Sequence, residues 1–413
     1  MALNASFSRP FPEQLAFFQA KLNLPSQRWD DITHAAHDRA FIVAGAAEAD
    51  LLQDLRDAVG AAIGGESIQD FRARFADIVQ QHGWHGWTGE GSAAGEAWRT
   101  RVIYQTNLAT SYAAGRWAQL TDPAFLKIRP YWRYVHADGV MHPRPMHLAW
   151  GEMQLTLRYD DPFWQTHFPP NGWGCHCYIV AVRAPAPDAA TSPPEGWNIP
   201  DPKTGELPGI DKGFGYAPGA HASTPLADLV EQKLFNLDAD LGAAMWARLE
   251  PAIAAERAQA WSNFLAGVQA DPVKRGRLQV AGALTPDVLG WLSGKSVTPA
   301  TAEIAVDDAL IVGQKAQRHL VKGDALTPAE WAALPTLLDA PDQVLYDTRS
   351  GHLIFVGKSN DTRSAKIAVE LDYQRKRAKG QTNLIVSAFK VPSVAIDGEI
   401  KGGFFEVVGK PGG

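Results

Sequence analysis

Residues 169–177 read PPNGWGCHC, and this stretch holds Cys175 and Cys177, the only two cysteines among 413 residues. The prolines and glycines in front of the thiols predict an ordered turn. A disulfide between the two is disfavoured, because side chains at positions i and i+2 of an extended segment point to opposite faces. Three interpretations follow from this spacing: a metal site, a buried pair of thiols, or a marker of the local fold.

Size and composition predict a globular protein of two or three domains, because a chain of 413 residues is too long to form a single hydrophobic core. Apolar residues make up 46% and charged residues 20%, and no apolar run approaches the roughly 18 residues of a membrane span. The first residues lack the basic and apolar regions of a signal peptide. We therefore expect synthesis and folding in the cytoplasm, reduced or metal-bound thiols, and no membrane partner.

The net charge of −6 hides an asymmetry along the chain. Residues 349–410 contain eleven Lys and Arg against six Asp and Glu, so this end is basic while the rest is acidic. A basic surface attracts polyanions, which makes the C-terminal region a candidate for nucleic-acid binding.

The pattern from Pro12 to about Gln119 is helical. In residues 47–63 and 65–79, apolar residues recur at spacings of three and four residues. Ser67 is placed to cap the second of these helices. From Pro123 to Val182 the period is lost, and the segment is irregular and rich in Trp and His, with short strands in WRYVHA and CYIVAV. Residues 184–225 hold nine prolines and six glycines and are predicted to be a linker.

A second helical region follows at 226–299, and a last domain is predicted over 300–413. There a helix precedes two hairpins, one formed by VLYD and LIFVG and one by KIAVELDY and NLIVSAFKV. The fold class is therefore α+β: a helical N-terminal region, an irregular segment, a Pro/Gly linker, and a C-terminal helix with a small antiparallel sheet of about four strands.

Three motifs occur in order: YQTN at 104–107, RPMH at 144–147 with Gly151, and PPNGWGCHC at 169–177. In this order they resemble the minor head proteins of Mu-like phages, the F-like head morphogenesis family. The resemblance covers about residues 28–183 and identifies 1–183 as the head morphogenesis domain. It implies a virion protein made during head assembly, associated with the portal region and present in few copies.

Zinc prefers thiolate and imidazole ligands, and a closed structural site needs four. Cys175 and Cys177 supply two, and His142 and His147 are the next candidates. Three further histidines are substitutes: His136, His167 and His176. The alternative is a turn without metal, whose small thiols pack under Trp164 and Trp173.

The other two motifs allow similar choices. Residues 104–107 either line a site or bond to the irregular segment that packs on their helix. Arg144 either holds a phosphate or carboxylate or bonds loop carbonyls. The spacing of residues in this region assembles no nucleophile, base and acid, so the region is not predicted to be an enzyme.

The order of Arg318 and His319, a helix, VLYD and NLIVSAFKV resembles the phage-associated nuclease domains of the barnase, EndoU, colicin E5/D and RelE type. Cleavage of RNA without a metal needs a base, an acid and a cation near the phosphate. The candidate catalytic residues are His319, Arg363, Lys366, Tyr373 and Ser387. The candidate nucleic-acid contacts are Lys358, Arg375, Lys376, Arg377 and Lys379. The alternative is that His319 and the basic turn are simply solvated.

The leading hypothesis is a portal-proximal minor capsid protein that carries a domain like a ribonuclease toxin. Its partners are the portal, other head proteins and, through the C-terminal domain, nucleic acid, and its place is the capsid interior near the portal. One rival is a packaged ribonuclease delivered to the host. Another is a module that binds nucleic acid without cutting it.

Overall fold

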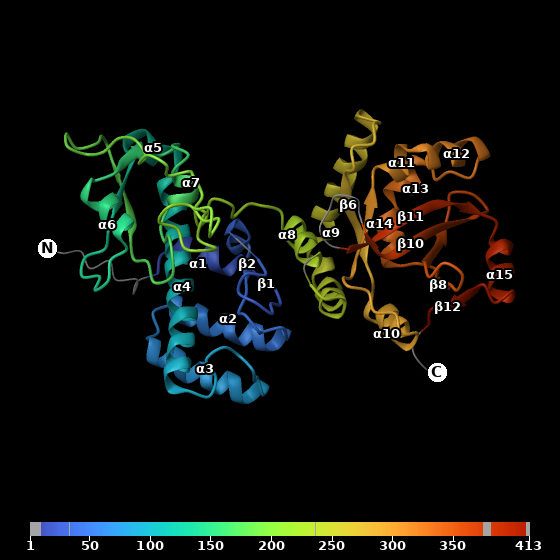
Figure 1. Cartoon of the computed structure of the whole chain (residues 1–413), viewed down its shortest axis with the longest axis horizontal. Coiled ribbons are helices and arrows are strands. Elements are labelled where there is room, and N and C mark those ends of the chain that lie inside the picture. The colour runs from blue at the N-terminus through green and yellow to red at the C-terminus, as the bar shows by residue number, and fades with distance from the viewer. Residues whose placement is uncertain (1–9, 33, 236, 375–380, 410–413) are drawn as a thin grey trace. The chain divides into compact units, whose positions relative to one another are not determined.

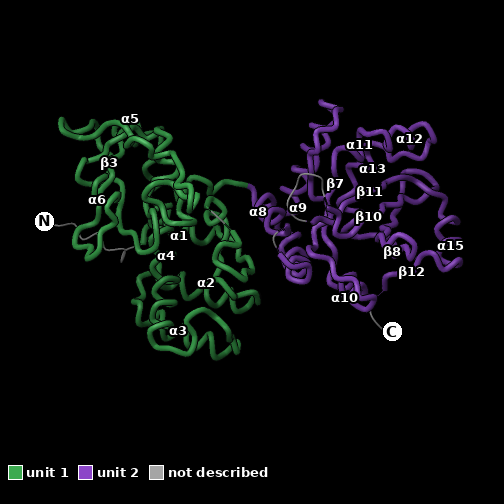
Figure 2. Tube along the Cα trace, viewed as in Figure 1, with its two compact units in different colours: residues 1–224 green, residues 225–413 purple. Residues whose placement is uncertain are grey.

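The computed structural model describes residues 10–32, 34–235, 237–374 and 381–409. The chain divides into two compact units, unit 1 from Met1 to Thr224 and unit 2 from Pro225 to Gly413 (Figures 1 and 2). Among the described residues, none of the helices has both the length and the apolar character needed to cross a membrane.

Unit 1 begins with a helical core. Three helices supply most of it: α2 (Ala49–Ile63), α3 (Ile68–His82) and α4 (Ala93–Leu120). The Ser67 hydroxyl accepts from the backbone of Asp70, whose carboxylate accepts from the backbone of Ser67, and this capping box starts α3. The helices predicted over 47–63 and 65–79 and the cap at Ser67 are confirmed. Four short elements precede α2: α1 (Pro12–Gln19), β1 (Leu22–Asn23), η1 (His34–Asp38) and β2 (Ala40–Phe41).

The second part of unit 1 is a three-stranded antiparallel sheet in the order β4-β3-β5. Its strands are β3 (Tyr131–Val135), β4 (Thr156–Arg158) and β5 (Tyr178–Val182). Trp132 and Tyr134 alternate into the core, where they join the aromatic rings of Trp150 and Trp164. The predicted strands are confirmed. Three short helices surround them: α5 (Pro123–Ile128), α6 (Pro145–Glu152) and α7 (Trp164–His167).

The Pro/Gly-rich segment 184–224 belongs to unit 1 and has no helix or strand. The segment packs into unit 1, because the side chains of Ile210, Phe214 and Tyr216 are buried and Ala217 is fully buried. Prolines and glycines fit a packed irregular path as well as a linker. The limit between the units falls at 224/225, one residue from the predicted end of the linker at 225/226. The sequence also places limits at 183/184 and 299/300, where the division into two units has none.

Unit 2 is built on a seven-stranded sheet in the order β12-β8-β9-β10-β11-β7-β6. Both predicted hairpins, β8-β9 and β10-β11, are confirmed. The sheet is larger than the four strands expected, and β7 pairs with β11 in parallel while the other neighbours are antiparallel. The strands are β6 (Leu278–Ala283), β7 (Glu303–Asp307), β8 (Gln343–Asp347), β9 (Leu353–Lys358), β10 (Ser364–Gln374), β11 (Gln381–Val391) and β12 (Phe405–Val407).

Helices complete unit 2 and confirm the α+β class. The predicted helix over TPAEWAALPTLLDA is two short helices, α13 and α14, which meet where Pro335 cannot continue the hydrogen-bond ladder. The helices are α8 (Leu226–Leu234), α9 (Ala239–Ala270), α10 (Pro286–Gly294), α11 (Ala309–Val312), α12 (Gln314–Lys322), α13 (Pro328–Ala332), α14 (Leu334–Asp339) and α15 (Ser393–Lys401).

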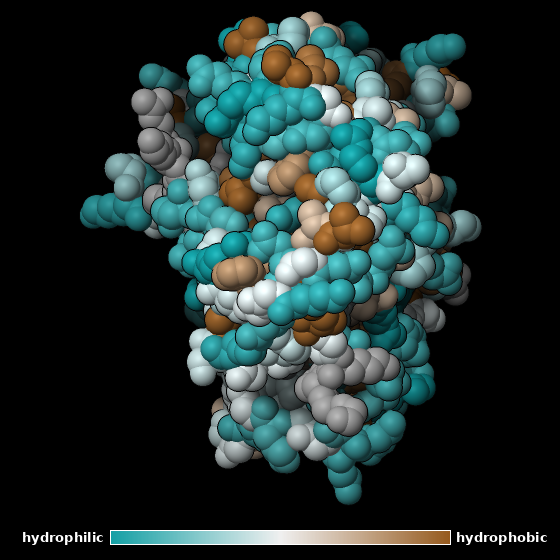
Figure 3. Space-filling view, turned by 90° about the vertical axis from the view of Figure 1, so that its right-hand side faces the viewer, coloured by the Kyte–Doolittle hydropathy of each residue, from teal (hydrophilic) through white to brown (hydrophobic). Residues whose placement is uncertain are grey.

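The face of unit 2 that carries α12 and α15 is mainly hydrophilic, and its hydrophobic residues are few and form no extended patch (Figure 3). Isolated apolar side chains on a surface are ordinary and need no partner to cover them. We therefore do not assign a docking surface to this face.

Candidate metal centre

The stretch 169–177 runs from the end of α7 to the start of β5 and is fixed by polar contacts on both sides. The buried amide of Asn171 accepts from the Tyr134 hydroxyl at 3.0 Å, and its backbone carbonyl accepts from the backbone of Asp211 at 2.9 Å. The Cys175 backbone donates to the carbonyl of Gly172 at 3.1 Å. Gly174 has φ +67, a conformation that favours glycine, so the chain can turn there and bring Cys175 back under the sheet.

Gly172 is needed for space. A Cβ atom at this position would lie 2.2 Å from the Asp211 carboxylate. That carboxylate accepts from the Trp173 backbone N–H at 2.9 Å and pairs with the Arg144 guanidinium at 2.6 Å. Arg144 also donates to the Trp173 carbonyl at 2.9 Å. Arg144 thus holds a carboxylate of its own chain, that of Asp211, and also bonds a loop carbonyl, so its contacts match both alternatives.

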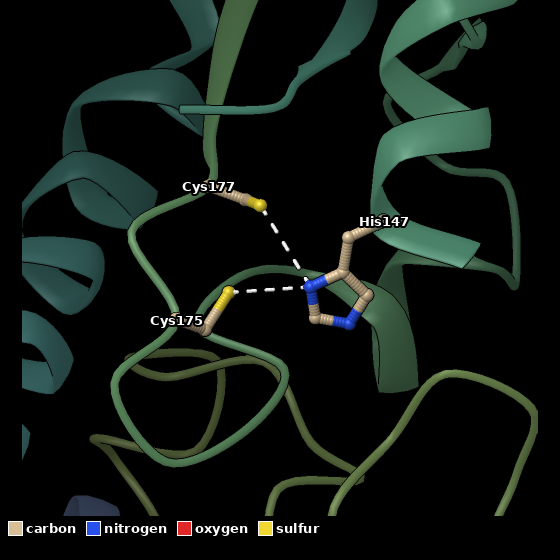
Figure 4. Close-up of side chains that lie close together, drawn as sticks. All are labelled: His147, Cys175 and Cys177. Carbon is tan, nitrogen blue, oxygen red and sulfur yellow. Dashed lines mark hydrogen bonds between the residues drawn. The ribbon is translucent and has the colours of Figure 1, made fainter. Parts of the chain in front are cut away.

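Cys175, Cys177 and His147 meet at one point (Figure 4). His147 lies on α6, one turn from its start, and is 2% exposed. Its Nε2 donates to the carbonyl of Gly209 at 2.7 Å, so in the neutral ring Nδ1 is unprotonated. Nδ1 lies 3.6 Å from Cys175 Sγ and 3.8 Å from Cys177 Sγ, as the dashed lines in Figure 4 mark.

The electrostatics of the two thiols differ. A hydrogen bond from Cys175 to the Cys177 sulfur holds the pKa of Cys177 well below its ordinary value, and contacts with His147 and Tyr134 act in the same direction. The same hydrogen bond, together with burial, raises the pKa of Cys175. Cys177 is therefore the more acidic of the two thiols.

This geometry fits a zinc ion. With Zn–S of about 2.3 Å and Zn–N of about 2.05 Å, a tetrahedral angle places N and S about 3.6 Å apart. The two observed N–S distances, 3.6 and 3.8 Å, agree with that spacing. The carbonyl of Gly209 fixes the ring and its tautomer from the far side, as the outer partner of a metal-bound histidine does. The centre therefore offers three ligands, and a tetrahedral ion would take a fourth from solvent or another chain.

The other histidines named from the sequence do not join this group within the described part of the chain. His142 is exposed before α6, and His136 is half-buried beside Gly151. His167 is fully buried, contacts Thr166 and the carbonyl of Pro208, and burial lowers its pKa to about 4. His176 is exposed, one residue from each thiol.

The residues at 104–107 lie on α4 and face different surroundings. Tyr104 donates to the backbone of Glu66 at 2.8 Å, and Asn107 donates to the carbonyl of Ile103 at 2.9 Å in its own helix. Thr106 and Asn107 also line a cavity of unit 1. These two hydrogen bonds do not reach the irregular segment named from the sequence, and lining of a site stays a prediction.

In unit 2, three residues named as catalytic lie near one another: His319 and Lys366 both contact the ring of Phe389, and Arg363 donates to the carbonyl of Gly323. His319 on α12 pairs with Asp324 at 2.7 Å and stacks on Phe389 at 4.6 Å. Arg363 is occupied by Asp361 at 2.7 Å.

The remaining candidates of unit 2 lie on the sheet or outside the described residues. The pairing of β9, β10 and β11 puts Lys358, Lys366 and Ser387 on one face. Tyr373 lies far along β10, opposite Thr382. Four basic residues lie outside the described part of the chain: Arg375, Lys376, Arg377 and Lys379.

Sequence reasoning missed the residues that hold the centre from a distance. Gly209 and Asp211 come from the segment interpreted as a linker, and Tyr134 from a strand. The available signal was the dense alternation of Pro and Gly with Ile210, Phe214 and Tyr216, since a solvated linker has little use for large apolar residues.

Comparison with known proteins agrees with the motif order. The family described as Phage Mu protein F like protein matches residues 51–180, which span α2 to β5 and include all three ligands. The putative capsid assembly protein F of Escherichia phage Mu is 29% identical over 97% of this chain and 95% of its own length. The Mu-like prophage FluMu F protein of Haemophilus influenzae is 28% identical over 91% of this chain and 96% of its own length. No solved structure matches. The chain is therefore similar to Mu F-like proteins, through the family match around the three ligands in unit 1 and through the two relatives over both units.

Proposed function

We propose that this chain is a capsid assembly protein that acts in head morphogenesis of a Mu-like phage. The observation that carries the proposal is similarity over almost the full length to a protein named for capsid assembly. The similarity extends through unit 2, so the whole chain, rather than unit 1 alone, corresponds to that relative. Its partners are then other head proteins.

A more specific proposal concerns the location of this protein in the phage particle. We propose that it is a minor component of the head, near the portal and inside the capsid, made in the host cytoplasm and packaged in few copies. The ordered motifs at 104–107, 144–147 and 169–177 support this through the family resemblance.

Mass spectrometry of purified particles and procapsids tests both proposals. We expect this chain at a few copies per particle and cross-links to the portal protein. A phage that lacks the gene is expected to accumulate no filled heads. Particles that are complete, infectious and free of this chain would overturn the assembly role.

For the centre in unit 1 we propose one zinc ion, held by Cys175, Cys177 and His147 with a fourth ligand from solvent or another chain. The agreement of the N–S distances with a tetrahedral ion supports it. The ion would lock α6 to the strand that begins after Cys177 and so stabilise the fold of unit 1.

A second candidate function, contact of unit 2 with nucleic acid, rests on the shared face of Lys358 and Lys366 and on the basic balance of 349–410. The test is binding of the full chain to RNA and DNA at several salt concentrations, because phosphate contacts release counterions. RNA incubated with the chain and a chelator tests the stricter nuclease hypothesis. Loss of cleavage in His319→Ala would support it, and intact RNA would exclude it.

A further inference from the structure

Unit 1 contains a cavity of about 120 Å³ beside the 169–177 stretch. Its walls come from Lys21, Trp29 and His37, from β2 and the three residues after it, from the middle of α4, and from residues 173, 212–214 and 216. A cavity of about 150 Å³ is enough to hold benzene, so this one has room for a single ring or branched side chain.

One wall of the cavity is aromatic. Trp173 meets Trp29 edge-on at 5.6 Å and Phe214 at 5.0 Å, and all three rings line the cavity. Trp29 and Trp173 are each 38% exposed, so they lie where the cavity meets solvent. Exposed, touching tryptophans on a fixed loop are the kind of surface that binding partners use, because their rings cover much area at little cost in conformational entropy.

The cavity also contains cations and no carboxylate among its lining residues. Arg99 is 7% exposed and donates to the carbonyl of Ala44 at 2.6 Å. Its Nε has no acceptor, and no acid among the described residues pairs with it. A buried guanidinium without a counter-ion is costly, and an anion bound in the cavity that Arg99 lines would lower this cost.

Two lysines also line the cavity. The buried Lys21 ammonium donates to the carbonyl of His37 at 2.6 Å, and Lys212 pairs with Asp30 at 2.9 Å over the ring of Trp29. The nearest acid to Lys21 is Asp38, whose Oδ2 accepts from the backbone of Gly219 and His221. Asp30 and Asp38 do not line the cavity, so the field inside it is positive.

The neutral polar residues of the wall favour a small anion. The Thr110 hydroxyl donates to a carbonyl of α4, and the Asn107 side-chain amide donates one of its two N–H groups to another. The donors left for a ligand are therefore few, which suits a singly charged carboxylate better than a phosphate dianion.

We propose that this cavity binds a carboxylate carried on a single apolar group, with Arg99 facing the charge and Trp29 and Trp173 covering the apolar part. A free aryl acid and the C-terminal residue of another protein share this chemistry. The inference does not depend on the proposed assembly function.

The test is calorimetric titration of the full chain with 3-phenylpropionate, with its uncharged amide and with inorganic phosphate. We expect the acid to bind at least tenfold more tightly than the amide, and phosphate to bind weakly. Equal binding of acid and amide, tighter binding of phosphate, or no binding of the acid at millimolar concentration would each overturn the proposal. This comparison uses the wild-type protein, so it holds even where a variant fails to fold.

Variants locate the site. Arg99→Met is expected to reduce acid binding to the level of the amide, whereas Arg101→Met, an exposed arginine on the same helix, is expected to leave it unchanged. Thr110→Leu should fill the cavity and weaken both ligands. Acid binding that survives both Arg99→Met and Thr110→Leu would place the ligand elsewhere and overturn the assignment.

Two short peptides that end in Phe, one with a free carboxylate and one amidated, distinguish the source of the ligand. Tighter binding of the free peptide than of the free acid would identify a protein C-terminus as the ligand. Binding of the acid but of neither peptide would support the same site with a small molecule as its ligand.

Discussion

Arg144 and Asp211 lie 67 residues apart and pair at 2.6 Å, and together they bond both backbone polar groups of Trp173. The Arg144 guanidinium donates to the Trp173 carbonyl, and the Asp211 carboxylate accepts from the Trp173 N–H. The residue at the centre of the 169–177 stretch is thus held by its backbone, which leaves its indole free to cover the cavity. Two residues further on, the same stretch supplies the first thiol of the metal centre.

We predict that Asp211→Ala destabilises unit 1 by about 1–3 kcal/mol, because it leaves Arg144 and the Trp173 N–H without their shared acceptor. Urea unfolding followed by tryptophan fluorescence measures the loss. The matched control is Asp160→Ala, whose carboxylate pairs with Arg158 where both side chains are more than half exposed. Its cost should stay below about 1 kcal/mol. Equal costs for the two variants would contradict a structural role for the pair.

A second prediction concerns the metal. Elemental analysis of the purified chain should give one zinc per chain, and Cys175→Ser combined with Cys177→Ser should release it and lower the Tm, because metal binding and folding are linked. His147→Ala should also release the ion. His142→Ala is the control and should keep it, since this histidine is exposed and outside the group.

Two outcomes distinguish the alternatives for the thiols. A double cysteine variant that melts earlier while the wild type holds no metal would leave the thiols as packing groups. A double variant that melts like the wild type would contradict both the zinc and the packing interpretation.

A pH prediction follows from Glu303 on β7, which is fully buried. Burial raises its pKa from 4.5 to about 7, and the charge of Asp372 acts in the same direction. Between pH 4.5 and pH 7 the Glu303 carboxyl is protonated in the folded chain and ionised in the unfolded chain. The contribution of the protonated carboxyl to the stability of the fold is therefore fully present below pH 4.5 and is lost as the pH rises through 7. The loss is on the order of 3 kcal/mol.

Unfolding of wild type and Glu303→Gln between pH 4.5 and pH 8 measures this contribution. The glutamine of the variant cannot ionise, so the unfolding free energy of the variant should rise relative to that of the wild type as the pH rises. Asp397→Asn, on the exposed side of α15, should keep the wild-type profile. A difference that does not change with pH would show that Glu303 is not the titrating group.

The elements that follow a local rule could be predicted from the sequence. Helices α2 and α3 have apolar residues at three and four, and Ser67 has the spacing of a cap, so their stability is encoded within a few residues. The two hairpins of unit 2 likewise pair neighbours in the chain. Cys175, Cys177 and His147 were found because thiols are rare here and imidazole is their usual companion in a metal site.

What could not be predicted depends on distant partners. β7 joins the sheet by pairing in parallel with β11, almost 80 residues later, and β6 then adds to its outer edge. The apolar run around 304–306 was the available signal, but a short run of this kind does not identify its neighbour. The packed course of residues 184–224 was missed for a related reason, because composition alone does not distinguish a bound irregular segment from a free one.

The last prediction concerns Arg257 on α9, whose side chain is 4% exposed. It pairs with Glu250 and Asp339, each at 2.8 Å, donates to the carbonyl of Ala281 on β6 and lies over the ring of Trp246. Arg257→Met keeps the length and the apolar stem but leaves two partly buried carboxylates facing each other without their cation. Removing one partner of a buried ion pair costs about 3–5 kcal/mol.

We therefore expect Arg257→Met to destabilise unit 2 by about 3 kcal/mol, toward the lower end of that range, because both carboxylates keep some access to water. Arg275→Met is the matched control, since Arg275 pairs with Asp271 on the surface and should cost less than about 1 kcal/mol. Scanning calorimetry with urea unfolding measures both. If Asp339→Asn in the Arg257→Met background restores stability, repulsion between the carboxylates accounts for the loss. No restoration would assign the loss to packing against Trp246 and the bond to Ala281 instead.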